Sequence, residues 1–214
     1  MNAREAIMQS IRKGLKRETL VSLEERNIQR LEAHIIPQHV QISNSEIIKL
    51  FITKAKSVSA TVASGDPGEI VDLVKDYLKG DRSAIKVAPG LEQLTWGDLP
   101  IAFGTAIETD RVGISQAIAA VAETGTLVCA ASPKTPTLLN FLPETSIILL
   151  EKRQIMATYE EAWQQFALNK CLPRTINFIT GPSRTGDIEQ KLLLGIHGPK
   201  KLHIILIDGT LNND

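Results

Sequence analysis

Short apolar blocks, separated by polar and turn residues, run along most of the chain and predict strands that alternate with helices. The runs at residues 146–150 and 202–207 are almost continuously apolar, as expected of strands buried on both faces of a sheet. Shorter runs at residues 58–63, 84–88 and 101–103 predict further strands. This alternation predicts an α/β fold built on an open, largely parallel sheet.

Capping patterns indicate where helices begin between these strands. Ser43 and Glu46 have the spacing of a capping box, and so do Thr158 and Glu161. Residues 66–69, Asp-Pro-Gly-Glu, combine a capping carboxylate with a proline in the first turn. Three helices are therefore expected to start at these positions.

The chain before residue 43 has a helical pattern of its own. Four apolar residues share one face of its first predicted helix: Ile7, Met8, Ile11 and Leu15. We therefore divide the chain into an N-terminal helical arm at residues 1–42, an α/β domain at residues 43–208 and a tail at residues 209–214. The arm could pack on the domain or on a partner subunit, or it could be a solvated amphipathic helix.

Residues 177–208 contain the first candidate site. An apolar strand leads into the loop Gly-Pro-Ser-Arg-Thr-Gly, a short helix is expected at residues 187–194, and a second Gly-Pro turn precedes the last strand. The start of such a helix would favour an anion, and Arg184 could add a fixed positive charge. The alternative is that Ser183 or Thr185 only caps the helix and that Arg184 is solvated.

Residues 110–130 contain the second candidate site. A strand is expected to lead into a turn or helix of small residues, and another buried strand follows. Between them, Glu123 stands beside the hydroxyls of Thr124 and Thr126 and beside Gly125. Glu123 could act as a general base, as a carboxylate nucleophile or as a group that orients a ligand. The alternative, which the spacing favours, is a turn whose polar groups satisfy one another.

Composition and charge exclude several classes of function. Lys plus Arg and Asp plus Glu number 24 each, so the chain has no general field that would attract nucleic acid. No apolar run approaches the roughly 18 residues of a membrane span. The sequence has no glycine-rich dinucleotide signature, P-loop or serine nucleophile elbow. The chain is expected to be cytoplasmic, to bind no nucleic acid and to have no membrane span.

Cysteine and histidine spacing predicts no metal site. Cys129 and Cys171 match no metal-ligand or iron–sulfur spacing, so both are expected to be reduced thiols, and the chain is expected to hold no cofactor of its own. His203 lies in a strand pattern and is expected to be a hydrogen-bonded sheet residue. His197, between Gly-Ile and Gly-Pro, stays open as a site residue.

Three sequence blocks carry a resemblance to the lactate-utilisation (LUD) domain family. They are Ala-Glu-Thr-Gly-Thr-Leu-Val at residues 122–128, Gly-Pro-Ser-Arg-Thr-Gly-Asp-Ile-Glu at 181–189 and Leu-Gly-Ile-His-Gly-Pro at 194–199. The resemblance implies an open parallel sheet related to the CoA-transferase and ribose-5-phosphate isomerase group. The lack of a cysteine cluster agrees with the family's C-type members. One departure is at residues 115–118, Ser-Gln-Ala-Ile, where relatives often carry Thr-Gly-Ala-Asp, so that their aspartate has no counterpart here.

The resemblance also implies a function. It indicates a non-redox subunit that supports oxidation of L-lactate to pyruvate, with iron–sulfur clusters held by two partner proteins. The ligand would be a small carboxylate or phosphate-bearing molecule in one cleft at the strand ends, where Glu123 would orient or deprotonate a hydroxyl. The residues expected to bind the ligand are Thr124, Gly125, Thr126, Gly181, Ser183, Arg184, Thr185, Asp187 and His197.

Two alternatives from other classes of function remain open. The first is a stand-alone enzyme of the CoA-transferase or folate cyclo-ligase type, with Glu123 as nucleophile or with the Gly181 loop holding a nucleotide phosphate. The second is a regulatory or assembly protein without a substrate. No helix-turn-helix pattern supports a transcription factor.

Overall fold

The computed structural model describes residues 3–15, 42–81, 83–167, 173–188 and 191–211. The chain divides into two compact units, residues 1–36 and residues 37–214. The described part of the first unit is helix α1 (Ala3–Gly14), which buries none of its residues. The rest of the predicted arm falls at residues 16–41, outside the described residues.

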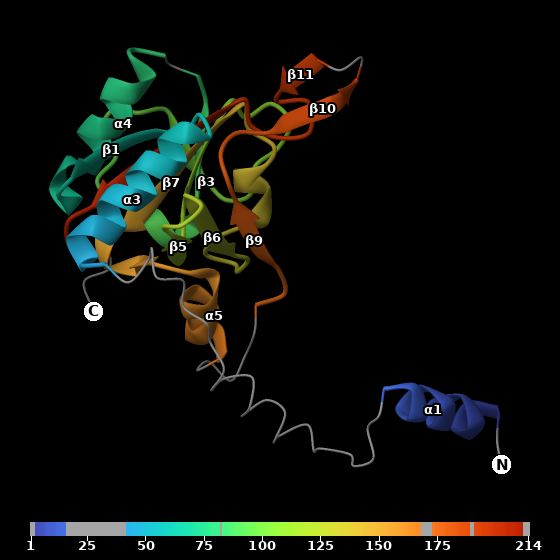
Figure 1. Cartoon of the computed structure of the whole chain (residues 1–214). Coiled ribbons are helices and arrows are strands. Elements are labelled where there is room, and N and C mark those ends of the chain that lie inside the picture. The colour runs from blue at the N-terminus through green and yellow to red at the C-terminus, as the bar shows by residue number, and fades with distance from the viewer. Residues whose placement is uncertain (1–2, 16–41, 82, 168–172, 189–190, 212–214) are drawn as a thin grey trace. The chain divides into compact units, whose positions relative to one another are not determined.

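A six-stranded, fully parallel sheet forms the centre of the second unit (Figure 1). Two neighbouring inner strands of this sheet are the two apolar runs recognised in the sequence, and Ile148 lies opposite Ile204 in their register. The prediction of an open, largely parallel sheet is confirmed. In spatial order the strands are β1 (Thr61–Gly65), β12 (Lys201–Ile207), β7 (Thr145–Glu151), β4 (Val112–Gln116), β2 (Ile85–Val87) and β3 (Ile101–Phe103).

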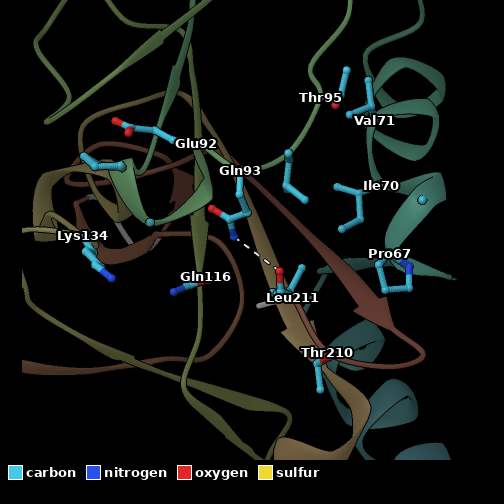
Figure 2. Close-up of a pocket in the computed structure, with 14 residues that line it drawn as sticks. Pro67, Ile70, Val71, Glu92, Gln93, Thr95, Gln116, Lys134, Thr210 and Leu211 are labelled. Carbon is cyan, nitrogen blue, oxygen red and sulfur yellow. Dashed lines mark hydrogen bonds between the residues drawn. The ribbon is translucent and has the colours of Figure 1, made fainter. Parts of the chain in front are cut away.

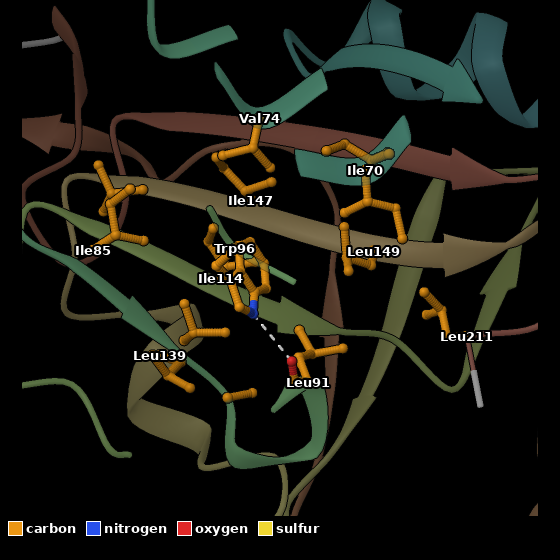
Figure 3. Close-up of a cluster of buried hydrophobic side chains, with 14 of the residues drawn as sticks. Ile70, Val74, Ile85, Leu91, Trp96, Ile114, Leu139, Ile147, Leu149 and Leu211 are labelled. Atoms are coloured by element: carbon orange, nitrogen blue, oxygen red, sulfur yellow. Dashed lines mark hydrogen bonds between the residues drawn. The ribbon is translucent and has the colours of Figure 1, made fainter. Parts of the chain in front are cut away.

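Helices α3 (Asn44–Ser57) and α4 (Ile70–Leu78) cover opposite faces of this sheet. Successive side chains of a strand point to opposite faces. Accordingly Ile147 of β7 packs in one core cluster with residues of α4, whereas Ile148 packs in another with residues of α3. Figure 3 shows Val74 of α4 beside Ile147, and Ile70 of α4 beside Leu149. Each such buried side chain contributes roughly 1.5–3 kcal/mol of hydrophobic stabilisation.

Both helices begin where the capping patterns predicted. The Ser43 amide and hydroxyl both donate to the Glu46 carboxylate, at 2.9 and 2.7 Å. The Asp66 amide donates to Glu69 at 2.9 Å before α4. The third predicted start is also confirmed, because α5 (Tyr159–Ala167) follows Thr158 directly. Short 3-10 segments connect other elements: η2 (Pro67–Glu69), η3 (Pro89–Leu91), η4 (Thr137–Asn140) and η5 (Lys152–Gln154).

A second, four-stranded mixed sheet lies on the α3 side of the main sheet. The prediction of a turn or helix at its residues 119–121 was wrong, because they form a strand. All three side chains are fully buried, and the strand pairs with a neighbour on each edge. Tertiary packing therefore overrides the helix propensity of alanine. In spatial order the strands are β8 (Ile155–Met156), β5 (Ala119–Val121), β6 (Thr126–Ala130) and β9 (Ile176–Ile179).

The prediction of a helix at residues 187–194 was also wrong. The chain there forms an antiparallel hairpin of β10 (Arg184–Ile188) and β11 (Lys191–Leu194). The two ends of this segment are held side by side, because the Gly195 amide donates to the Ser183 carbonyl at 2.9 Å. A helix would carry those ends apart, so the expected βαβ unit and its anion-binding helix start do not form. Among the described residues, no helix is long and apolar enough to cross a membrane.

Candidate functional site

The Gly-Pro-Ser-Arg loop and the Gly-Pro turn after His197 lie together and line a pocket of about 320 Å³. The Ser183 amide joins the two segments by donating to the Pro199 carbonyl at 2.9 Å. Ser146 and Leu202, near the amino ends of β7 and β12, also line the pocket. The pocket is therefore at the amino edge of the parallel sheet, not at the carboxyl edge where ligands usually bind in such sheets.

Arg184 and His197 are the charged or ionisable side chains among the described residues that line this pocket. Both are exposed. Arg184 donates from Nη2 to the Ser59 hydroxyl at 2.6 Å, which fixes one arm of its guanidinium. The group has five N–H donors in a planar fork, so further donors remain for a carboxylate.

Two buried polar side chains line the inner part of the same pocket. Ser146 is 1% exposed, and its hydroxyl has no hydrogen-bond partner among the described residues. Asn140, also buried, accepts a hydrogen bond from the Ser115 hydroxyl at 2.5 Å. A buried hydroxyl without a partner is costly, so Ser146 is a natural contact for a polar ligand atom.

The Glu-Thr-Gly-Thr block forms the turn between β5 and β6, and its hydroxyls bond to one another. The Thr126 Oγ1 atom lies 2.7 Å from that of Thr124, 2.9 Å from the Tyr159 hydroxyl and 2.6 Å from Oγ1 of Thr180. A hydroxyl offers one donor and two acceptor positions, and three neighbours use them fully. This is the self-satisfied turn that the spacing favoured.

The Thr126–Thr180 contact links the two candidate blocks, but the structure does not place them in one cleft. None of the residues from Glu123 to Thr126 lines the pocket that holds Arg184. Glu123 is half-buried; its amide donates to the Ala157 carbonyl at 3.2 Å, and its carboxylate makes no hydrogen bond or ion pair with the described residues. Of the predicted ligand-binding residues, the pocket brings together four: Gly181, Ser183, Arg184 and His197.

Two glycines, one from each candidate block, pack against the end of α3. Gly125 and Gly181 have positive φ angles of 70° and 78°, which L-residues rarely adopt. A Cβ on Gly125 would overlap the Ala55 amide nitrogen, and one on Gly181 would overlap the Val58 carbonyl oxygen. Close packing against α3 is therefore sufficient to require glycine at both positions. Thr185 and Asp187 follow in β10.

Other ionisable groups of interest lie in the core. His203 confirms the expected sheet role, since its Nδ1 lies 2.8 Å from the Thr61 hydroxyl, and its ring stacks on Tyr77 at 3.9 Å. Burial lowers the pKa of His203 to about 4 and raises the pKa of the Cys129 thiol to about 12. Within the described part of the chain, no three His, Cys, Asp or Glu side chains group as metal ligands.

A larger cavity, of about 1000 Å³, lies at the opposite edge of the sheet (Figure 2). Segments that follow the carboxyl ends of β1, β2 and β12 line it, together with Gln116 at the end of β4 and Lys134. None of the predicted site residues lines it. Turn residues after the strands, such as Pro89-Gly90, were the one feature of the sequence that pointed to this region. The cavity itself could not be predicted, because it depends on the strand order that brings these strand ends together, and the sequence does not reveal that order.

Comparison with known proteins places the chain in a family. A crystal structure of a DUF162 family protein from Deinococcus radiodurans superposes with a TM-score of 0.61, covering 78% of this chain and 99% of that chain at 17% identity. This likeness shows a shared fold.

Curated relatives are closer in sequence. Lactate utilization protein C from Macrococcus caseolyticus is 37% identical over 105 residues, which cover 47% of this chain and 46% of the relative. The protein of the same name from Bacillus subtilis is 36% identical over 104 residues, 47% of this chain and 43% of the relative. The matched stretch thus spans less than half the length of these relatives. The sequence model of the LUD domain matches residues 3–207. The chain belongs to the LUD domain family.

Proposed function

We propose that the chain is a non-redox subunit of a lactate-utilisation system that supports oxidation of L-lactate to pyruvate with iron–sulfur partner proteins. The observation that carries the proposal is its similarity, at 36–37% identity, to relatives named Lactate utilization protein C. The pocket around Arg184 supports it, because a volume of about 320 Å³ suits a small acid.

The polar groups of this pocket match the polar groups of L-lactate. We assign the lactate carboxylate to the free N–H groups of Arg184, since guanidinium and carboxylate form paired, charge-assisted hydrogen bonds. The α-hydroxyl is assigned to His197, because imidazole is the commonest proton acceptor in such steps. Ser146 offers a further hydroxyl. Glu123, which the sequence suggested for the α-hydroxyl, does not line this pocket and has no role in the proposal.

The electrons of the reaction leave through partner subunits in this proposal. Oxidation of L-lactate to pyruvate releases two electrons and two protons. The sequence contains two cysteines, whereas an iron–sulfur cluster is usually held by about four thiolates. This chain therefore binds and orients the acid, and clusters on the partners accept the electrons.

The test isolates the assembled complex from cells grown on L-lactate, through a tag on this chain. We expect cysteine-rich partners with iron–sulfur absorbance, and lactate-dependent reduction of an added electron acceptor. Arg184→Ala should slow this reduction about tenfold or more by removing a charge-assisted contact, whereas Arg174→Ala, an exposed control, should not. Isolation of the chain without iron–sulfur partners, or undiminished turnover with Arg184→Ala, would refute the proposal.

A further inference from the structure

The cavity at the carboxyl edge of the main sheet has two chemically different walls. Figure 2 shows Lys134 and Gln116 on one side and Pro67, Ile70 and Val71 on the other. Ligands of open parallel sheets bind at this edge, outside the carboxyl ends of the strands. We propose that this cavity is a second binding site, for a carboxylic acid with an apolar body. The proposal is independent of the pocket around Arg184.

The polar wall is built by two loops and one strand end that meet at Gly90. The Gly90 amide donates to the Lys134 carbonyl at 2.8 Å. A Cβ at Gly90 would lie 3.1 Å from that carbonyl oxygen and 3.4 Å from Nε2 of Gln116. The loop after β2, the end of β4 and the loop after β6 are therefore in contact, and they present an ammonium and an amide to one region of the cavity.

The backbone around Lys134 is fixed before any ligand binds. The Ser132 hydroxyl accepts from the amides of Lys134 and Thr135, at 3.2 and 3.1 Å. The Thr135 hydroxyl donates to the Ala130 carbonyl at 2.7 Å. A loop held in this way loses little backbone entropy on binding, which favours affinity. The Lys134 ammonium itself makes no ion pair with the described residues, so it is available to an anion.

The charges of the lining favour a ligand with one negative charge. Among the described residues that line the cavity, Lys134 is the one cation and Glu92 the one carboxylate. Figure 2 shows Glu92 on the same side as Lys134. An anionic head group can pair with Lys134 and accept from the Gln116 amide, while a second negative charge would meet Glu92.

The opposite wall requires an apolar body on the ligand. It is formed by Pro67, by the start of α4 and by Leu94, and the ring of Pro67 is rigid. Gln93 lies between the walls and donates from Nε2 to the Leu211 carbonyl at 3.4 Å, which ties the segment after β2 to the segment after β12. A cavity of about 1000 Å³ is far larger than a short acid such as lactate needs, so contact with both walls requires a larger acid.

Titration calorimetry on the full chain tests the site with three probes. Naphthoate has both a carboxylate and an apolar ring. Naphthalene carboxamide has the same ring without the negative charge, and acetate has the charge without the ring. We expect naphthoate to bind with a dissociation constant of about 1 mM or lower, and the other two at least about tenfold more weakly. The absence of naphthoate binding, or equal binding of the amide or of acetate, would overturn the proposal.

Variants then locate the binding. Lys134→Ala should weaken naphthoate about tenfold, and Gln116→Leu several-fold, without affecting the amide. Lys49→Ala, which removes an exposed lysine of α3, is the matched control and should bind as wild type does. In a Trp163→Phe background, buried Trp96 beside the cavity-lining Thr95 should report binding by a change in fluorescence. Unchanged affinity with Lys134→Ala, or no response of Trp96, would refute the assignment to this cavity.

Discussion

Replacement of Gly125 by alanine tests the packing of the site loops on α3. Gly125 has φ +70° in the turn between β5 and β6. An added Cβ would overlap the Ala55 amide nitrogen and would lie 2.6 Å from the Lys54 carbonyl carbon. These are backbone atoms inside a helix, so they cannot move aside as a flexible side chain could. Either the turn or α3 has to shift.

Two costs add in this variant. An L-residue in the left-handed region costs roughly 1–2 kcal/mol. Overpacking against a rigid neighbour costs typically about 1–3 kcal/mol more, because α3 would be pushed from the core where Phe51 and Ala55 are fully buried. We therefore expect Gly125→Ala to lower the free energy of unfolding by about 3 kcal/mol, a large fraction of the roughly 5–15 kcal/mol of a typical domain.

Urea unfolding followed by circular dichroism measures this change. The control is Gly68→Ala, because a Cβ at Gly68 would meet no atom within 4 Å and its φ is not positive. The control should change the free energy of unfolding by less than about 0.5 kcal/mol. A loss of less than about 1 kcal/mol for Gly125→Ala would contradict the described contact between this turn and α3.

Three further predictions concern buried groups. Burial lowers the pKa of His203 from 6.5 to about 4, so stability that is complete above pH 6.5 should fall as the pH drops toward 4. The free energy of unfolding should change by up to about 1.4 kcal/mol per pH unit in this range, and His203→Gln should remove this contribution to the slope. Equal slopes in the wild type and the variant would exclude His203 as the cause. Tyr159→Phe should cost about 1 kcal/mol, because Thr124 and Thr126 lose a hydroxyl partner; no change in urea unfolding would argue against the cluster. Cys129, with its pKa raised to about 12, should resist iodoacetamide until the chain is unfolded, and labelling of the native protein, located by peptide mass spectrometry, would contradict its burial.

Local signals in the sequence predicted much of the fold. The hydrogen bonds of the Ser43–Glu46 capping box join residues within one turn of helix, so their formation depends little on the rest of the chain. Continuous apolar runs such as residues 202–207 are buried wherever the sheet places them. These signals sufficed for the class of fold and for three helix starts.

The errors came from contacts between distant residues. Residues 187–194 have good helix formers, but the bonds of Ser183 to Gly195 and to Pro199 bring the chain back on itself and favour a hairpin. Likewise the contact of Thr126 with Thr180 spans 54 positions, and no spacing rule predicts it. The cavity of Lys134 and Gln116 depends on strand order, in which β4 lies beside β2 although β3 separates them along the chain.

The central claim, that the pocket around Arg184 binds a small hydroxy acid, is tested most directly by calorimetric titration of L-lactate into the complex that contains this chain. We predict saturable binding with the wild-type chain, about tenfold or more weaker binding with Arg184→Ala, and wild-type binding with Arg174→Ala. Absence of lactate binding to the wild-type complex, or equal affinity with Arg184→Ala, would contradict the account.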